Sequence, residues 1–306
     1  MALSGIQIYK LLPQTNCKEC GFPTCLAFAM KLAAKQADLA KCPHVSDEAR
    51  ETLSEAAAPP VRLVTLSADG REVKSGNEIV LFRHEKKFFN RPGVFIRVVD
   101  TDEEAAITEK VSAATSYAVD YVGLDLSLDG FAVEATSGDA ATFADAVGTV
   151  RKASGLPLIL VSEDPAVVEA GFKVLDGESP LLLGANSTNW ETMADLARQS
   201  ETSLGVVAGT LEELAELTEK IQDKGVEDMV LHPAATTMGS SLALQTQIRR
   251  LALKNFRPLG YPTVAFTGNG GNPAKESTLT AHAICKYAGL VVMDTFSPEL
   301  IYPILV

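Results

Sequence analysis

Four of the chain's five cysteines lie within its first 42 residues, and this cluster constrains the fold more than any other sequence feature. They read Cys17-Lys-Glu-Cys20-Gly-Phe-Pro-Thr-Cys25 and then, after sixteen further residues, Cys42-Pro43. Thiolates this close in sequence indicate a metal site, a disulfide pair or a redox dithiol. The rest of the chain holds one cysteine, Cys285. The pattern therefore predicts a small cysteine-rich unit attached to a larger scaffold.

The composition restricts the partners and the compartment. The chain has 306 residues, a formal net charge of −12 and a pI near 4.9. Binding to nucleic acid requires clustered Lys and Arg to neutralise phosphates, so this acidity argues against such a partner. No run approaches the roughly 18 apolar residues of a membrane span, and the N-terminus lacks the pattern of a secretory signal. We therefore expect a cytoplasmic protein, in which thiols stay reduced.

The cysteine spacing favours an iron–sulfur cluster over zinc. Four thiolates can hold a tetrahedral Zn²⁺ ion or a [4Fe–4S] cube. Zinc ribbons usually repeat a CxxC pair, whereas this chain has one CxxC followed by spacings of four and sixteen residues. A compact three-cysteine loop with a distant cysteine before proline is typical of iron–sulfur sites. We predict a [4Fe–4S] cluster, with structural zinc and a redox dithiol as alternatives; the expected ligands are Cys17, Cys20, Cys25 and Cys42.

Helix signals flank the cysteine loop. Ser4 is a candidate N-cap for a short helix over residues 4–12. Thr24 is a candidate N-cap for a helix beginning at Cys25, whose first-turn N–H groups favour a thiolate. A further helix is expected from Asp47 to Ala57. Because all four expected ligands are thiolates, no iron would have an open position, which argues for electron transfer or a structural staple rather than substrate chemistry at iron.

The remainder of the chain alternates between apolar strand-like runs and helical patterns. Two short strands, Val61–Leu66 and Asn77–Phe82, are expected to form a hairpin around Asp69-Gly70. The later expected strands are apolar throughout, as is usual for parallel strands covered on both faces. They are Val94–Val99, Tyr121–Leu126, Leu158–Val161, Leu181–Leu183, Leu204–Ala208, Met229–Leu231, Thr263–Phe266 and Val291–Met293. The expected helices are Glu103–Ser116, Ala140–Ala153, Pro165–Leu175, Trp190–Arg198, Leu211–Lys224, Leu242–Lys254 and Ser277–Tyr287.

About eight strand–helix units predict the α/β fold class, with a (β/α)8 TIM-type barrel preceded by a small α-helical [4Fe–4S] domain and a β-hairpin. An open doubly wound sheet is the alternative. The expected boundaries are 1–58 for the cluster domain, 59–92 for the linker and hairpin, and 93–306 for the barrel. The last expected helix starts near Pro298 and ends on an apolar stretch at Val306. That ending is unusual for a complete protein, so we expect a helix that is cut short or a natural chain that continues.

Polar residues at the carboxyl ends of the expected strands are candidate site residues, because barrel enzymes place their sites there. Such residues also commonly cap loops and helices, so none is assigned a catalytic role. They are Asp100, Asp125, Asn186, His232, Asn269 and Asp294. His44 is interpreted as a neighbour of the cysteines rather than a ligand. Cys285 is interpreted as an ordinary buried thiol.

Several segments resemble the large subunit of the corrinoid/iron–sulfur protein of the Wood–Ljungdahl (reductive acetyl-CoA) pathway. They equally resemble the gamma subunit of the archaeal acetyl-CoA decarbonylase/synthase complex. The resemblance covers essentially the whole chain, and the cysteine spacing is its most specific part. The segments that carry it are Leu3–Pro13, Asn16–Met30, Cys42-Pro43, Phe88–Pro92, Asn186–Trp190 and Phe296–Ile301.

The resemblance implies a methyl carrier. In that family a methyl-tetrahydropterin donates methyl to Co(I) of a corrinoid, and the enzyme that makes acetyl-CoA receives it. An iron–sulfur cluster returns oxidised Co(II) to Co(I). The implied cofactors are a [4Fe–4S] cluster bound by Cys17, Cys20, Cys25 and Cys42, and a corrinoid in the complete protein or complex.

The implied partners are the small subunit, in a barrel–barrel heterodimer, a pterin methyltransferase, and acetyl-CoA synthase/CO dehydrogenase; neither nucleic acid nor a membrane is among them. The family's large subunit continues into a C-terminal corrinoid-binding domain that this chain lacks, so it is not expected to hold the corrinoid by itself. Two other readings stay open. One is a stand-alone barrel pterin methyltransferase with a structural cluster, which would depend on Asn186. The other is an assembly module stapled by zinc.

Overall fold

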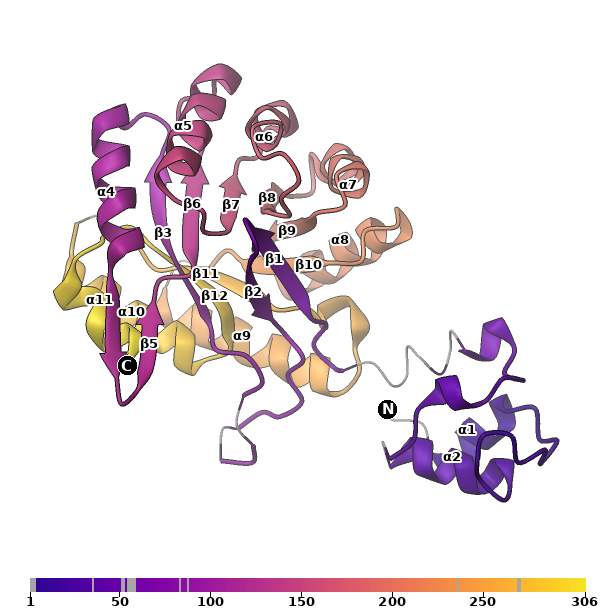
Figure 1. Cartoon of the computed structure of the whole chain (residues 1–306). Coiled ribbons are helices and arrows are strands. Elements are labelled where there is room, and N and C mark those ends of the chain that lie inside the picture. Colours follow the sequence, from indigo (N-terminus) through magenta and orange to yellow (C-terminus); the bar gives the residue numbers. More distant parts are fainter. Residues whose placement is uncertain are drawn as a thin grey trace. The chain divides into compact units, whose positions relative to one another are not determined.

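The computed structural model describes residues 4–34, 36–50, 53, 59–82, 84–86, 88–235, 237–268 and 271–306. The chain divides into two compact units, Met1–Pro60 and Val61–Val306 (Figure 1). Each unit is described by itself.

The first unit is built from two packed helices and the loops around them. Its elements are α1 (Gly5–Leu11), α2 (Cys25–Ala33) and the 3-10 helix η1 (Leu39–Lys41). The two predicted N-caps are confirmed. The Ser4 hydroxyl accepts from the Gln7 backbone N–H, and the Gln7 side chain accepts in return from the Ser4 N–H at 2.8 Å. The Thr24 hydroxyl accepts from the Ala27 N–H at 3.0 Å.

The helix expected from Asp47 to Ala57 is only partly described. Residues 47–50 and 53 are helical, and the other residues of this prediction lie outside the described part of the chain. Val45, Ala49 and Leu53 are buried in the core of the first unit. The segment after the cysteine loop thus contributes apolar side chains to the same small core as α1 and α2.

The second unit opens with the predicted hairpin, but the predicted strand boundaries were wrong. The strands are β1 (Val64–Ala68) and β2 (Arg71–Ser75), paired from Val64↔Ser75 to Ala68↔Arg71. Asp69 and Gly70 have φ of 44° and 74°, so a tight two-residue turn sets this register. Residues 77–82 lie beyond β2 and form no strand.

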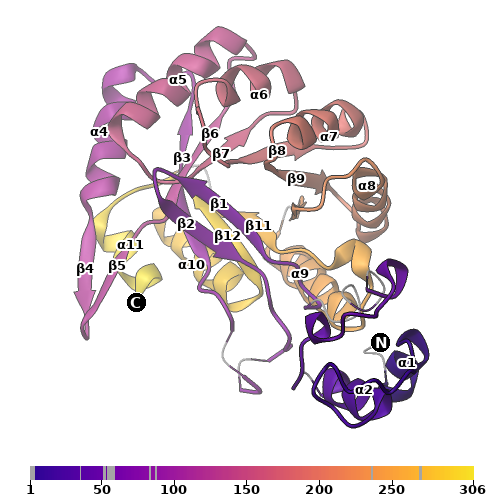
Figure 2. The ribbon, with the colours of Figure 1, turned by 45° about the vertical axis from the view of Figure 1, so that its right-hand side comes forward.

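Parallel strands then close into the predicted TIM-type barrel. Their order around the ring is β10-β11-β12-β3-β6-β7-β8-β9, with β9 paired to β10, and Figure 2 shows the helices outside it. The barrel strands of the described chain are β3 (Gly93–Val99), β6 (Gly130–Glu134), β7 (Leu158–Val161), β8 (Leu181–Ala185), β9 (Ser203–Ala208), β10 (Met229–Pro233), β11 (Thr263–Phe266) and β12 (Ala288–Met293).

Helices follow the strands and cover the outside of the barrel. They are α4 (Glu104–Ser116), α5 (Ala140–Ala153), α6 (Pro165–Phe172), α7 (Trp190–Gln199), α8 (Leu211–Asp223), α9 (Met238–Leu253), the 3-10 helix η2 (Arg257–Leu259), α10 (Pro273–Cys285) and α11 (Pro298–Leu305). Several begin with a side-chain cap on a backbone N–H, as at Asp139, Asp164 and Thr210. Such caps satisfy N–H groups that have no partner inside the helix.

The barrel interior and the hairpin share one apolar cluster. Phe95, Leu181 and Val264 point into the barrel and cluster with Leu66 and Val73 of the hairpin. A side-chain carbon at Gly93, the first residue of β3, would lie 2.9 Å from a Val73 methyl group. The hairpin therefore closes the end of the barrel at which the strands begin, which leaves the carboxyl ends as the open face.

One predicted barrel strand was wrong. The run Tyr121–Leu126 folds instead as an antiparallel ribbon, β4 (Ala118–Tyr121) and β5 (Leu124–Ser127), while β6 takes the barrel position. Val122 and Gly123 form the turn with φ of 54° and 76°. A β-branched residue seldom adopts a left-handed conformation, so a turn at Val122 could not be expected from its residue type. Consequently Asp125 lies on the ribbon, not at a barrel strand end.

Candidate functional site

The four cysteines of the first unit lie at different depths. Cys25 and Cys42 are buried, with exposed fractions of 6% and 3%, and belong to the core around Phe28. Cys20 is partly buried and Cys17 is exposed. A group bound by these four thiolates would therefore be anchored in the core and would present one side to solvent.

The backbone of the cysteine loop turns repeatedly through the left-handed region. Left-handed φ values occur at Gln14, Asn16, Lys18 and Gly21, at 57°, 49°, 68° and 82°. Turns of this kind direct backbone N–H groups toward one side and form the concavities that hold many iron–sulfur clusters. The Asn16 side chain accepts from the Cys25 N–H at 2.8 Å, which ties the loop to the first turn of α2.

The structure also places two other potential ligands beside Cys17. The Cys17 Sγ, a Glu19 oxygen and a His44 nitrogen lie within 4.8 Å of one another, and Glu19 and His44 are bonded at 2.8 Å. Among the described residues, this is the one group of three or more His, Cys, Asp or Glu side chains whose ligand atoms all lie this close together. Four thiolates on one zinc ion would lie only about 3.8 Å apart, given a Zn–S bond of roughly 2.3 Å. Within the described residues, no three of the clustered cysteines bring their sulfur atoms within 4.8 Å of one another.

At the carboxyl ends of the barrel strands, three charged side chains form one ion-paired cluster. Arg97 of β3 donates from Nη1 to Glu134 at 2.7 Å and from Nε to Asp294 at 2.7 Å. Burial alone would lower the pKa of Arg97, but the charges and hydrogen bonds of the two carboxylates raise it overall. Gly268 leaves room for this arrangement, because a side-chain carbon there would lie 2.1 Å from the Asp294 carboxyl carbon.

His232 of β10 faces a cavity at the same end of the barrel. The cavity is about 580 Å³ in volume and reaches across six strands; its lining includes Glu134, Val161, Leu183, Val207, His232 and Phe266. Burial lowers the pKa of His232, whereas its hydrogen bond to the Val264 carbonyl raises it by a smaller amount. The ring of His232 lies against Phe266, with 5.1 Å between centroids.

The other strand-end candidates have structural roles or fall elsewhere. Asp100 accepts hydrogen bonds from the backbone and hydroxyl groups of Thr136 and Ser137, which fixes the loop after β6. Asn186 accepts from the backbone and hydroxyl of Thr188 and so shapes the turn into α7. Asn269 lies outside the described residues. Of the predicted set, His232 and Asp294 reach the open face.

Arg97 and Glu134 were not predicted as site residues. A signal existed, since Arg97 interrupts the otherwise apolar run Val94–Val99 and Glu134 ends the Phe-Ala-Val run of β6. Cys285 was predicted to be a buried thiol and is exposed. It is the last residue of α10, where the helix ends at the surface rather than in the core.

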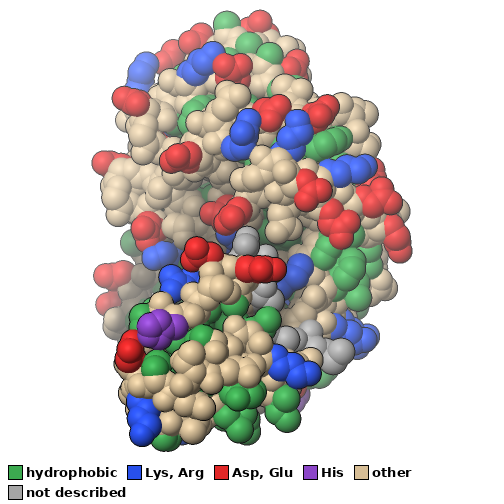
Figure 3. All heavy atoms as spheres, turned by 90° about the vertical axis from the view of Figure 1, so that its right-hand side faces the viewer, with side chains coloured by type: hydrophobic (Ala, Val, Ile, Leu, Met, Phe, Trp, Pro, Cys, Tyr) green, Lys and Arg blue, Asp and Glu red, His purple; other side chains and the backbone are tan. Residues whose placement is uncertain are grey.

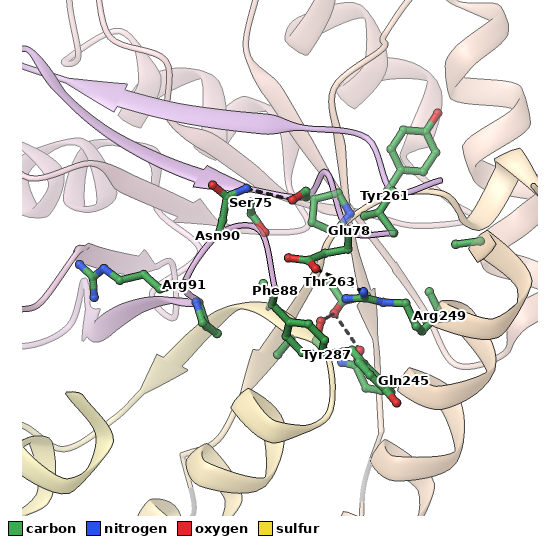
Figure 4. Close-up of a pocket in the computed structure, with 18 residues that line it drawn as sticks. Ser75, Glu78, Phe88, Asn90, Arg91, Gln245, Arg249, Tyr261, Thr263 and Tyr287 are labelled. Carbon is green, nitrogen blue, oxygen red and sulfur yellow. Dashed lines mark hydrogen bonds and ion pairs between the residues drawn. The ribbon is translucent and has the colours of Figure 1, made fainter. Parts of the chain in front are cut away.

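A second cavity lies at the opposite end of the barrel (Figure 4). Arg249 lies beside the rings of both Phe88 and Tyr287, with its guanidinium carbon 5.4 Å and 4.9 Å from their centroids, and its Nη1 lies 3.6 Å from a Glu78 oxygen. Glu78 also accepts from the Phe89 N–H at 3.1 Å. The volume is about 30 Å³, room for roughly one water. The segment Phe88–Pro92 thus serves to fasten a long loop onto the barrel.

The surface adds two observations. Within the described residues, no helix combines the length and the apolar character needed to cross a membrane. On the face shown in Figure 3, acidic and basic side chains are interspersed and do not form a broad basic patch. This agrees with the formal net charge of −12.

Comparison with known families assigns both units. Residues 63–306 match the family described as CO dehydrogenase/acetyl-CoA synthase delta subunit, and residues 12–44 match the family described as "Putative Fe-S cluster". The corrinoid/iron-sulfur protein large subunit of Moorella thermoacetica is 42% identical over 306 residues, covering 100% of this chain and 68% of that protein. The gamma subunit of the acetyl-CoA decarbonylase/synthase complex of Methanopyrus kandleri is 38% identical and covers 99% and 68%.

Solved structures confirm the barrel. A dihydropteroate synthase of Stenotrophomonas maltophilia matches with a TM-score of 0.56 at 12% identity, covering 79% of this chain and 96% of that chain. The Xanthomonas albilineans enzyme matches with a TM-score of 0.54 at 14% identity, covering 79% and 96%. At such identities the likeness shows the fold alone.

Proposed function

Because the chain belongs to the family of corrinoid/iron–sulfur protein large subunits and acetyl-CoA decarbonylase/synthase gamma subunits, we propose that it is the electron-relay subunit of a corrinoid methyl carrier. The carrier takes methyl from a methyl-tetrahydropterin and delivers it to acetyl-CoA synthase. The observation that carries the proposal is the cysteine loop, with its four graded thiols and left-handed turns, inside a chain similar to these subunits along its whole length.

The four cysteines bind a [4Fe–4S] cluster from two sides. Cys25 and Cys42 anchor it from the core, whereas Cys20 and Cys17 hold the side nearer solvent. When bound, the cluster supplies single electrons, which in this family would return a Co(II) corrinoid to Co(I). The exposed side at Cys17 supports this role, because electron exchange with another protein requires close approach.

The barrel has the role of a scaffold in this proposal. Its partners are the small corrinoid/iron–sulfur subunit, as a second barrel, the pterin methyltransferase and acetyl-CoA synthase/CO dehydrogenase. Phe88–Pro92, Asn186–Trp190 and Phe296–Ile301, which resemble the family, support the scaffold directly. The first clamps a loop, the second shapes the turn into α7, and the third places Phe296 against Tyr117 at 5.9 Å.

The test follows cobalt in the assembled complex. The reaction starts from a complex whose iron–sulfur cluster is reduced and whose corrinoid is in the Co(II) state, and it is followed by rapid-mixing absorbance. We expect the absorbance of Co(I) to grow while the absorbance of the oxidised iron–sulfur cluster returns. Cys17→Ser should abolish this growth with little loss of core packing, because Cys17 is exposed. Cys285→Ser is the matched control and should leave the rate unchanged. Methyl transfer by this chain alone, without corrinoid, would contradict the proposal.

A further inference from the structure

The cavity beside His232, at the open end of the barrel, has no role in the proposed electron transfer. We propose that it is a binding site for a small planar heterocycle that carries amino or ring N–H donors, as in a nucleobase or a pterin. The volume of about 580 Å³ falls within the range of small-molecule sites. The lining comes from the carboxyl ends of β6 to β11, the end at which barrels bind their ligands.

One wall of the cavity suits a flat ring. Val161, Leu183 and Val207 provide aliphatic surface, and Phe266 adds an aromatic ring. The rings of Phe266 and His232 are tilted by 59° with their centroids 5.1 Å apart. Aromatic side chains favour offset or edge-to-face contact with another ring, so a planar ligand gains more here than a flexible one.

His232 offers a single, fixed hydrogen-bond acceptor. Its Nδ1 lies 3.2 Å from the Val264 carbonyl oxygen. Because a carbonyl only accepts, the proton of the neutral ring must be on Nδ1, and Nε2 keeps a free lone pair. In the described part of the chain no residue bonds Nε2. The ring therefore accepts from a ligand N–H and cannot donate to a ligand carbonyl.

The charges around the cavity select against anions. Glu134 and Asp294 share the one guanidinium of Arg97, so this cluster keeps a net negative charge. Lys110 donates to the backbone carbonyls of Arg97 and Asp294, and the carboxylates of Asp102 and Glu276 offset its positive charge. Glu163 and Asp164 add two further carboxylates to the lining. Phosphates and carboxylates would be repelled, whereas N–H donors would be attracted.

The experiment titrates the full chain, with its iron–sulfur cluster, with adenine, pterin and naphthoate separately by calorimetry. Adenine and pterin represent the two common sources of the proposed chemistry, and naphthoate is a planar anion. We expect saturable binding of adenine or pterin with a Kd below about 1 mM and no binding of naphthoate. Binding of neither heterocycle, or stronger binding of naphthoate, would overturn the proposal.

Variants locate the site. His232→Phe keeps a ring beside Phe266 but removes the acceptor, and should weaken heterocycle binding by about tenfold. His84→Phe makes the same change on the loop before β3 and should leave the affinity unchanged. Nitrogen NMR of the ring provides a readout independent of affinity: His232 should show a protonated Nδ1, and its Nε2 signal should move when the ligand binds. Unaltered affinity in His232→Phe, or a protonated Nε2, would refute the assignment.

Discussion

The two units of the chain differ in what their cores contain. Of the nine buried hydrophobic residues described in the first unit's core, two are Cys25 and Cys42. The described core clusters of the barrel unit contain no cysteine. A unit of about 60 residues buries too little apolar surface to be robust alone. We therefore expect the first unit to depend on a group bound by its thiolates, as proposed above, and the barrel to depend on packing.

The largest expected effect comes from removing a buried ligand. Cys42→Ser should abolish nearly all iron–sulfur absorbance and make the first unit sensitive to protease, because metal binding there is also folding energy. The melting transition of the barrel should stay within about 1 °C, since the described cores of the two units share no residue. Absorbance, limited proteolysis and calorimetry measure the three quantities. Cys285→Ser is the control, because Cys285 is exposed on α10; a barrel transition lost together with the cluster would break the contrast between the units.

The next largest effect is expected from a substitution that leaves a cavity in the core of the barrel and does not touch the first unit. Phe95 has no exposed surface, and its ring lies where a side chain at Gly130 would clash, at 2.4 Å. Phe95→Ala should lower the free energy of unfolding of the barrel by about 3–5 kcal/mol. Denaturant titration followed by the tryptophan of α7, Trp190, measures this. The iron–sulfur spectrum should stay unchanged, and its loss would show that the two units share one cooperative fold.

A smaller effect is expected at Asp100, which is buried and accepts four hydrogen bonds from Thr136 and Ser137. Burial alone would raise the pKa of Asp100, but these bonds lower it overall. Its stabilisation is complete above the unfolded pKa, about 3.9, and is lost as pH falls through the lower folded pKa. Asp100→Asn should cost about 2 kcal/mol near neutral pH and progressively less in acid. A cost that does not change with pH would mean that the charge is not what matters.

The smallest effect is expected from the pH response of His232. Burial lowers the pKa of His232 below its usual value. The stability tied to its neutral ring is complete above the unfolded pKa of about 6.5, and it declines as pH falls through the folded pKa. His232→Phe should therefore flatten the change in the denaturant midpoint of the barrel between about pH 7 and pH 5. An unchanged slope would show that folding does not shift the pKa of His232.

Local signals predicted the first unit's helices well. Ser4 and Thr24 act as caps where the sequence placed them, because capping depends only on residues three positions away. The eight-unit alternation predicted the barrel for the same reason, since each strand–helix pair has its own periodic pattern. β11 and α5 occupy the predicted residues, Thr263–Phe266 and Ala140–Ala153.

The failures concern features that only the tertiary structure decides. The ribbon β4–β5 turns at Val122. Valine rarely adopts the left-handed conformation, so its residue type does not predict a turn. The mouth cluster joins Arg97, Glu134 and Asp294, which are far apart in sequence and meet only because β12, β3 and β6 are neighbours in the ring. The burial of Cys25 and Cys42 likewise follows from their place in the core around Phe28, which the cysteine spacing does not reveal.

Our proposal depends above all on the four clustered thiols holding one redox-active iron–sulfur cluster. Anaerobic analysis of the purified full chain for iron, sulfide and zinc, with electron paramagnetic resonance before and after one-electron reduction, tests it most directly. We expect about four irons and four sulfides per chain, and one paramagnetic centre that appears on reduction and disappears in Cys42→Ser. About one zinc per chain, no sulfide and no signal on reduction would contradict it.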